Sequence, residues 1–384
     1  MERFVPYGRQ YIDDDDVSEV LKVLESDFIT QGPRIQEFEE KLAEYCGARY
    51  AVALSSGTAA LHAAYSALGL AAGDEIITSP ITFAATSNAA LYTGARPVFV
   101  DVEPCTANMD VGLIEGAVTD KTRIIVPVHY GGHPVDLEGA CRVARDRGLF
   151  MVEDASHALG ARYAGERIGC CRHSDITVFS FHPVKHITTA EGGAVLTNSE
   201  ELYRKVLLFR SHGISRDRFV NSPDGPWYYE MQMLGYNYRM SDLQAALGIS
   251  QIRKLKGFIE RRRLIAETYN NVFRDNPYFD IPVEKDYAFS SYHLYSIRLK
   301  DGYKDKRGMV FTRLRQKGVG VQVHYIPVYT QPYYQGLGYE AGACPAAEDF
   351  YAREMSIPIH PSMTDDDIGF VVRRILEVFG EIGD

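Results

Sequence analysis

The sequence predicts an α/β protein whose first domain has a mostly parallel sheet and whose second, smaller domain is α+β. Short apolar segments that resemble strands alternate with helix-like segments from about residue 35 to residue 250, and this alternation is typical of parallel sheets. A long helical stretch follows, and the alternation then stops. We therefore expect a large domain over residues 1–260, including an N-terminal helical segment, and a small domain over residues 261–384.

Two helices are expected at the start of the chain. The aspartates at 13–16 suit a helix N-terminus because their charges complement the helix dipole, and apolar residues then recur at helical spacing in VSEVLKVL. After a turn at ITQGP, the amphipathic segment IQEFEEKLAEYC predicts a second helix that ends at Gly47.

Strands and helices then alternate through the large domain. Strands are expected at RYAVAL, DEIITS, RPVFVDV, TRIIVPVH, FMVEDAS, DITVFSF and GGAVLTN, and helices at SSGTAALHAAYSALG, TFAATSNAALYTG and DLEGACRVARDRG. The small domain is expected to contain the strands YHLYSIRLK and VGVQVHYI and to close with the helix DDDIGFVVRRILEVFG.

The composition is that of a soluble globular protein. Of 384 residues, 46% are hydrophobic and 24% charged, which is ordinary for a chain of two domains. The net charge of −10 argues against nucleic acid or an anionic membrane as a partner. Six cysteines without a C-x-x-C pair predict reduced thiols. With no apolar signal core and no run of about 18 apolar residues, we expect a cytoplasmic protein.

Ligands in open α/β sheets bind beyond the carboxyl ends of the strands. The strand AVAL is followed by Ser55-Ser56-Gly57-Thr58 at the start of a helix, where amides and hydroxyls suit a phosphate. The strand IITS is followed by Phe83, an aromatic side chain that suits stacking on a flat ring. These two strand ends therefore predict a site for a phosphorylated aromatic ligand.

Two further strand ends carry ionisable groups. FMVE is followed by Asp154 and His157, and ITVFSF is followed by Lys185. A lysine, a carboxylate, an aromatic platform and a phosphate cradle together suit pyridoxal 5′-phosphate, because the lysine binds its aldehyde and Asp154 keeps its ring nitrogen protonated. Each feature alone has an ordinary explanation, such as a capped helix start, a core aromatic or a solvated lysine. Their joint occurrence favours the cofactor site.

The sequence disfavours three other functions. A dinucleotide enzyme needs G-x-G-x-x-G, and GVGVQV at 318–323 lacks the third glycine. A metal site is not expected, because His129 and His133 lie in the turn HYGGH without a third ligand. A protein that only binds the cofactor would not need both Lys185 and Asp154, so an enzyme is favoured.

The chain resembles, over nearly its whole length, the DegT/DnrJ/EryC1/StrS sugar aminotransferases, a pyridoxal-phosphate-dependent family of fold type I. The resemblance is carried by SSGTAALHAA, PITFAATSNAALYTGARPVFVDV, VEDASHALGARY, FSFHPVKHITTAEGGAV, RSHGI and GYNYRMSDLQAALG. It implies that Lys185, Asp154 and His157 are the catalytic residues. Lys185 would carry the cofactor, Asp154 would pair with the ring nitrogen, and His157 would lie near the ring hydroxyl.

The resemblance also implies the remaining cofactor contacts. Phe83 would stack on the ring, and Gly57, Thr58 and Ser180 would surround the phosphate. Asn237, in GYNYRM, would reach the phosphate of the neighbouring subunit's cofactor, which implies a homodimer with shared active sites.

Some members of the family replace the lysine with histidine and catalyse a deoxygenation. This chain retains Lys185, with His186 as its neighbour, and transamination is therefore expected.

Within the family, PWYYEMQMLGYNYRMSDLQAALG and GVGVQVHYIPVYTQPYY resemble the transaminases of pseudaminic acid biosynthesis. This implies amination at C4 of UDP-2-acetamido-2,6-dideoxy-β-L-arabino-hexos-4-ulose with L-glutamate as amino donor. Another NDP-4-keto- or 3-keto-sugar is the alternative. By the same resemblance, residues of three segments would surround the nucleotide-sugar: Tyr7, then Asp27, Phe28 and Ile29, then His324, Tyr325, Ile326 and Pro327. His324 and Tyr325 are equally well explained as strand residues of the small domain.

Overall fold

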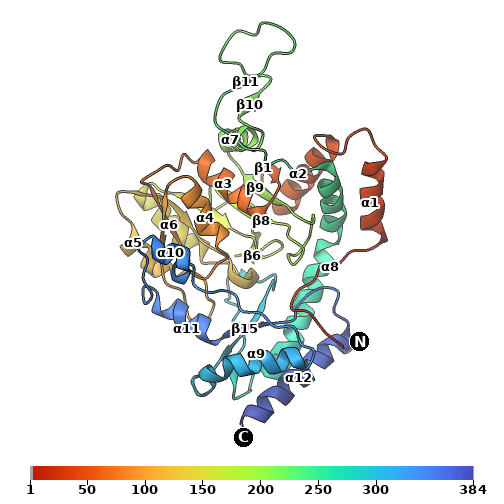
Figure 1. Cartoon of the computed structure of the whole chain (residues 1–384), viewed down its shortest axis with the longest axis vertical. Helices are drawn as coiled ribbons and strands as arrows, with labels where there is room; N and C mark the ends of the chain where they lie inside the picture. The colour runs from red at the N-terminus through yellow and green to blue at the C-terminus, as the bar shows by residue number, and fades with distance from the viewer. Residues whose placement is uncertain (1–2, 384) are drawn as a thin grey trace.

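The computed structural model describes residues 3–383 and is built around a seven-stranded sheet (Figure 1). The strand order is β1-β9-β8-β5-β4-β2-β3, and only β9 runs antiparallel to its neighbours. The strands are β1 (Tyr50–Leu54), β2 (Glu75–Thr78), β3 (Arg96–Phe99), β4 (Thr122–Val126), β5 (Phe150–Asp154), β8 (Ile176–Ser180) and β9 (Gly193–Thr197). The predicted α/β class with a mostly parallel sheet is confirmed.

Helices cover both faces of this sheet. One buried cluster packs the sheet against α2 (Pro33–Cys46), α6 (Leu137–Arg147) and α8 (Asp242–Phe273). The other packs it against α3 (Gly57–Ala67), α4 (Ala85–Tyr92) and α7 (Glu200–Arg210). Adjacent strand residues alternate between the clusters, as Ile76 and Ile77 do in β2. Because both faces are buried, the strands are apolar along their whole length.

Several of the helices begin at side-chain caps that are visible in the sequence. In α1 (Asp14–Leu24), Asp13 and Asp16 form a capping box. Ser56 caps α3 by accepting a hydrogen bond from the amide of Ala59, and Ser241 caps α8. The caps at α3 and α8 fix where the chain turns at the edges of the sheet.

A second core contains a three-stranded antiparallel sheet, β12-β14-β15. Its elements include β12 (Phe279–Asp280), β14 (Tyr295–Leu299), β15 (Glu354–Ile357), α9 (Arg307–Gln316) and α12 (Asp365–Gly383). Helix α8 contributes Ile259 to the first core and Ile265 to the second. We propose to divide the chain between these two residues, into domains of residues 1–260 and 261–384. Val5, near the N-terminus, packs into the second core.

Short elements connect and extend these cores. They are η1 (Val111–Leu113), α5 (Ile114–Ala117), η2 (Tyr130–Gly132), β6 (Arg162–Tyr163), β7 (Glu166–Arg167), β10 (Ile214–Ser215), β11 (Glu230–Met231), β13 (Ala288–Phe289), η3 (Asp301–Lys306), η4 (Val328–Thr330), α10 (Pro332–Gly336) and α11 (Pro345–Arg353). The segment with β10 and β11 projects from the top of the molecule (Figure 1). No helix within residues 3–383 has both the length and the apolar character needed to cross a membrane.

The prediction of a regular strand at residues 319–326 is wrong. The segment forms only isolated bridges, from Val319 to Val5 and from Gln322 to Ser356. Its two partners are different parts of the chain, and neither lies beside it for long enough to build a ladder. The end of this segment nevertheless delivers His324 and Tyr325 to the cavity described next.

Candidate active site

A cavity of about 480 Å³ lies where the carboxyl ends of β1, β2, β5 and β8 meet. It is lined by every residue predicted to contact the cofactor except Asn237. These lining residues are Gly57, Thr58, Phe83, Asp154, His157, Ser180 and Lys185. They come from four strand ends that the parallel arrangement places at one edge of the sheet.

Lys185 stands in a turn just after β8. The amide of Lys185 donates to the carbonyl of His182 at 2.8 Å, and the amide of Phe181 donates to the carbonyl of Gly192 at 2.9 Å, which closes the loop at its base. The lysine is half-buried. Burial lowers its pKa from 10.5 to about 8, and the charge of Asp154 opposes part of this shift. About a tenth of the amine is therefore neutral at pH 7, far more than for a lysine in water, and reaction with an aldehyde requires the neutral form.

Asp154, at the end of β5, is buried and oriented by two hydrogen bonds. Its Oδ1 accepts from the amide of Ser156 at 3.1 Å, and its Oδ2 accepts from the hydroxyl of Thr86 at 2.6 Å. An ionised carboxylate has lone pairs beyond these two, so Asp154 can still accept from a protonated ring nitrogen.

His157 lines the cavity beside Tyr325. Its Nε2 is 3.0 Å from the Tyr325 hydroxyl, and burial lowers its pKa well below 6.5, with the charge of Lys185 adding to the effect. Its Nδ1 is buried and has no hydrogen-bond partner within residues 3–383. Phe83, 63% exposed, stands across the cavity with its ring centroid 6.3 Å from that of Tyr325.

The start of α3 forms a cradle with Ser180. The amides of Gly57 and Thr58 make no hydrogen bond within the described chain, and both residues line the cavity with Ser180. A Cβ added at Gly57 would stand 2.9 Å from the Cβ of Ser180, and one added at Gly193 would stand 2.4 Å from the carbonyl oxygen of Ser56. Only glycine permits this close approach, and the free amides suit a phosphate. The donor set thus fits pyridoxal phosphate, with Lys185 for the aldehyde and Asp154 for the ring nitrogen.

The residues predicted around the nucleotide-sugar are only partly brought together. Tyr7, His324 and Tyr325 line the cavity, with the rings of Tyr7 and His324 5.3 Å apart. The other predicted residues do not line it: Asp27, Phe28, Ile29, Ile326, Pro327 and, among the cofactor contacts, Asn237. Of these, only Pro327 is buried.

The sequence analysis did not predict a role for Thr86 or for its neighbour Thr82. Thr86 orients Asp154 and contacts Thr82 at 2.8 Å between hydroxyl oxygens. Thr82 lies in the bend before α4 and Thr86 in its first turn, and the two threonines are four residues apart in TFAAT. His129 and His133 each contact another polar side chain. The Nε2 of His129 is 2.9 Å from Oε2 of Glu153, and the Nδ1 of His133 is 3.2 Å from the side-chain nitrogen Nδ2 of Asn108.

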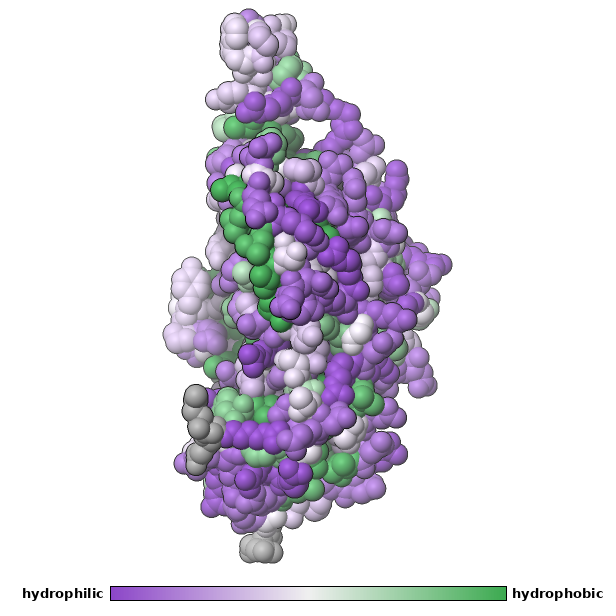
Figure 2. All heavy atoms as spheres, turned by 90° about the vertical axis from the view of Figure 1, so that its right-hand side faces the viewer, coloured by the Kyte–Doolittle hydropathy of each residue, from purple (hydrophilic) through white to green (hydrophobic). Residues whose placement is uncertain are grey.

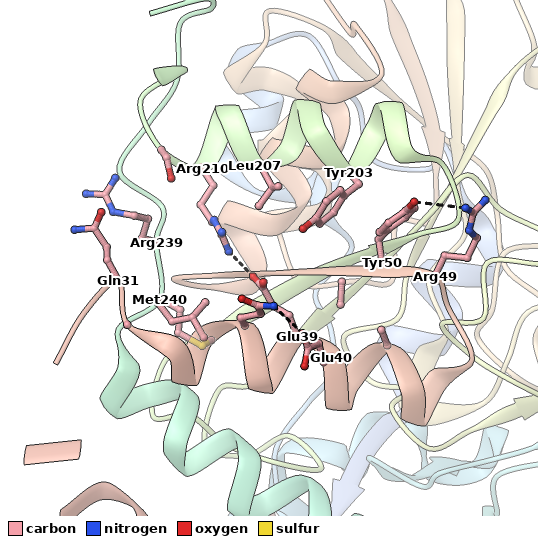
Figure 3. Close-up of a pocket in the computed structure, with 16 residues that line it drawn as sticks. Gln31, Glu39, Glu40, Arg49, Tyr50, Tyr203, Leu207, Arg210, Arg239 and Met240 are labelled. Carbon is pink, nitrogen blue, oxygen red and sulfur yellow. Dashed lines mark hydrogen bonds and ion pairs between the residues drawn. The ribbon is translucent and has the colours of Figure 1, made fainter. Parts of the chain in front are cut away.

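A second cavity, of about 500 Å³, lies between α2 and α7 and is shown in Figure 3. An ion pair between Glu39 and Arg210 crosses it. Glu39 accepts a hydrogen bond from the amide of Ala53 at 2.8 Å, and Arg210 donates to the carbonyl of Ala53 at 2.7 Å. Because β1 is the edge strand of the sheet, this pair protects an otherwise open backbone edge.

The fold and the site define an enzyme of the pyridoxal-phosphate class, with its lysine beyond the carboxyl edge of a mostly parallel sheet. Residues 10–376 match the DegT/DnrJ/EryC1/StrS aminotransferase family. The chain belongs to this family, and it is a sugar aminotransferase that depends on pyridoxal 5′-phosphate. The resemblance seen in the sequence is confirmed.

The similarity to known proteins extends along nearly the whole chain. A UDP-4-amino-4,6-dideoxy-N-acetyl-β-L-altrosamine transaminase of Campylobacter jejuni is 40% identical over 379 residues, or 98% of each chain. The spore coat polysaccharide biosynthesis protein SpsC of Bacillus subtilis is also 40% identical, over 98% of this chain and 97% of the relative. The structure of PseC of Helicobacter pylori, an aminotransferase involved in the biosynthesis of pseudoaminic acid, superposes with a TM-score of 0.93 at 36% identity, covering 99% and 100% of the two chains.

Proposed function

We propose that this protein transfers the amino group of L-glutamate to C4 of UDP-2-acetamido-2,6-dideoxy-β-L-arabino-hexos-4-ulose. The observation that carries the reaction class is the meeting of Lys185 and Asp154 in one cavity. The sugar is supported by the relatives from Campylobacter and Helicobacter, whose names state an altrosamine transaminase and a role in pseudoaminic acid biosynthesis. The donor is supported by the family to which the chain belongs.

We assign roles to the chain's own residues on the basis of the cavity that they line. When bound, pyridoxal phosphate supplies an aldehyde and a ring that withdraws electrons from the reacting carbon. Lys185 would hold the group covalently until glutamate displaces it. Its freed amine, with a pKa near 8, would then take a proton from the α-carbon of glutamate and, in the second half-reaction, deliver a proton to C4 of the sugar. Asp154, oriented by Thr86, keeps a positive charge on the ring nitrogen. Gly57, Thr58 and Ser180 bind the phosphate.

The test of the reaction class is the ultraviolet–visible spectrum of the purified protein with added cofactor. The wild type should show the band of a covalently attached cofactor and lose it when glutamate is added. Lys185→Ala should show neither the band nor turnover. A wild type that stays colourless after addition of the cofactor would overturn the assignment.

The test of the substrate is an assay with UDP- and dTDP-linked 4-keto-sugars, in which the position of the new amine is read by NMR. Amination of the UDP-sugar at C4 is expected. If only a dTDP-sugar reacts, or if the amine appears at C3, the substrate is wrong and the reaction class stands.

We also propose that two chains share their active sites. Asn237 is exposed outside the cavity of its own chain, in a position available to a neighbour. Figure 2 shows an apolar stripe on the side of the molecule where α1 lies. The exposed apolar residues of α1 are Val17, Leu21 and Leu24, and the turn after it exposes Phe28 and Ile29. Such a patch is typical of an interface.

The test combines solution mass with cofactor retention. The wild type should have the mass of two chains, and Asn237→Ala should lose the cofactor faster on dialysis, whereas the exposed Asn271→Ala should not. The proposal of a shared site would be contradicted if a monomer transaminates, or if the Asn237→Ala variant retains the cofactor as well as the wild type does.

A further inference from the structure

His324 faces the cavity with one ring nitrogen and the protein interior with the other. The residue is 6% exposed and lines the cavity. Its Nδ1 is 2.9 Å from the hydroxyl oxygen of Ser356 in β15. Its Nε2 makes no hydrogen bond to any atom of the described chain, and it is absent from the buried atoms that lack a partner. With Nδ1 turned inward, Nε2 is the atom that a ligand in the cavity can reach.

A buried carboxylate stands behind this pair. Glu354 is fully buried and takes part in no ion pair within residues 3–383. Its Oε2 accepts from the amide of His324 at 2.7 Å, and its Oε1 is 2.6 Å from the hydroxyl of Ser356. Burial raises the pKa of Glu354 to about 7, against the opposing effect of these hydrogen bonds. The carboxyl is therefore ionised in mildly alkaline solution.

The protons of this network can be assigned by counting donors and acceptors. The Tyr130 hydroxyl donates to the carbonyl of His324 at 2.7 Å, so its oxygen is left to accept from Ser296, 2.9 Å away. The oxygen of Ser296 also lies 3.1 Å from that of Ser356, and its one hydrogen can serve either contact. The hydroxyl of Ser356 lies 2.6 Å from Oε1 of Glu354, which is the shortest contact that this hydroxyl makes, and its hydrogen is therefore assigned to the carboxylate.

An ionised carboxylate can only accept, so Ser356 donates to Glu354 and its oxygen must accept from His324. His324 therefore carries its proton on Nδ1. The ring is neutral because burial, together with the charge of Lys185, lowers the pKa of His324 to about 3. Neutral imidazole has a single N–H, which leaves a lone pair on Nε2.

We propose that Glu354 and Ser356 are positioning residues that hold His324 in the Nδ1–H form, so that Nε2 accepts a hydrogen bond from a hydroxyl or amide hydrogen of the sugar. The inference rests on the proposed function for the identity of the ligand, whereas the tautomer is a property of the protein alone. A buried acceptor favours substrates that present a donor there, since a ligand without one leaves the acceptor unpaired.

The tautomer is tested by ¹⁵N NMR of protein labelled at histidine, at pH 8.5, with the signals of His324 identified from their loss in His324→Asn. The expected result is a protonated Nδ1 and an unprotonated Nε2 in the wild type. Ser356→Ala should abolish this preference. A wild type with its proton on Nε2 would overturn the proposal, whatever the substrate is.

The consequence for binding is tested with whichever nucleotide-sugar the wild type aminates. Loss of one neutral hydrogen bond is worth about 0.5–1.5 kcal/mol, so Ser356→Ala should raise KM for the sugar about 3- to 10-fold. The rate of cofactor bleaching by glutamate alone should change less than twofold. Equal effects on both half-reactions, or an unchanged KM, would overturn the role.

A matched control is present in the same chain. Ser362 lies 2.8 Å from the Nδ1 of His360, and neither residue lines the cavity. Ser362→Ala removes a similar serine–histidine contact and should leave KM for the sugar unchanged. If it raised KM as much as Ser356→Ala does, the effect would be a general loss of packing and the proposal would fail. Failure of the wild type to aminate the UDP-sugar would contradict the proposed substrate and leave the NMR result standing.

Discussion

The hydroxyl of Thr86 donates a 2.6 Å hydrogen bond to Oδ2 of Asp154, across 68 positions of sequence. Thr86 belongs to the helix that follows β2, and Asp154 ends β5, with β4 between these strands in the sheet. The bond holds the carboxylate at the angle from which it can meet a ring nitrogen in the cavity. Orientation of a functional carboxylate by a neighbouring donor is a common requirement of such sites.

Replacement of Thr86 by valine should therefore weaken cofactor binding. Valine keeps the shape and removes the donor, and a hydrogen bond to a charged group is worth about 1.5–3 kcal/mol. We expect the dissociation constant of pyridoxal phosphate to rise about tenfold or more, as measured by spectroscopic titration of the cofactor-free protein. Thr86→Ser should stay close to wild type. Tight binding by the valine variant would show that Asp154 does not depend on this contact.

The rate of cofactor attachment should depend on pH in a way set by Lys185. Burial lowers the pKa of this lysine to about 8, and only the neutral amine attacks an aldehyde. The attachment rate should rise about tenfold between pH 6 and 7 and level off above about pH 8, as followed by stopped-flow absorbance. A lysine in water, with a pKa of about 10.4, would give a rate that still rises at pH 9.5, and that result would contradict the burial of Lys185.

Replacement by alanine should weaken cofactor binding at Gly57 and leave it unchanged at Gly257. The added Cβ at Gly57 would meet the Cβ of Ser180 at 2.9 Å, so Gly57→Ala should displace the cradle and raise the dissociation constant of the cofactor about tenfold, on the scale of an overpacking cost of about 1–3 kcal/mol. Gly257 lies within α8 with nothing within 4 Å of the new atom.

Gly257→Ala should therefore stabilise the protein by about 0.5–1 kcal/mol, as measured by urea unfolding, and leave cofactor binding unchanged. An equal effect of the two substitutions on cofactor affinity would contradict the close packing of α3 on Ser180.

Removal of Arg210 should destabilise the large sheet. Glu39 is 9% exposed, and its pKa is raised by burial in spite of the charge of Arg210. Arg210→Met leaves this carboxylate buried without its ion-pair partner, which costs about 3 kcal/mol. Without the arginine, the folded state favours protonated Glu39 still more, so the deficit should shrink as pH falls from 7 to 5. The measurement is urea unfolding at both pH values.

The double variant with Glu39→Gln should recover part of the stability lost in Arg210→Met. A deficit that grows at acid pH would show that the ion pair is not responsible for the effect.

Much of the fold was predictable because its signals are local. The strands of the central sheet are apolar along their length since both faces are covered, as the partition of Ile76 and Ile77 shows. The site was predictable in outline for a related reason. Parallel strands end at one edge, so Asp154 after β5 and Lys185 after β8 had to be near each other once their order along the chain was known.

The sequence by itself therefore determined which chemical group each strand end presents, because those groups depend only on neighbouring residues. Only the tertiary structure decided which of these groups are joined. Glu354, Ser356 and His324 meet because the segment 319–326 bridges first to the N-terminal part of the chain and then to β15. Thr86 reaches Asp154 because of the order of strands in the sheet. Hydrogen bonds between distant residues follow from how the layers pack, and no local pattern encodes that packing.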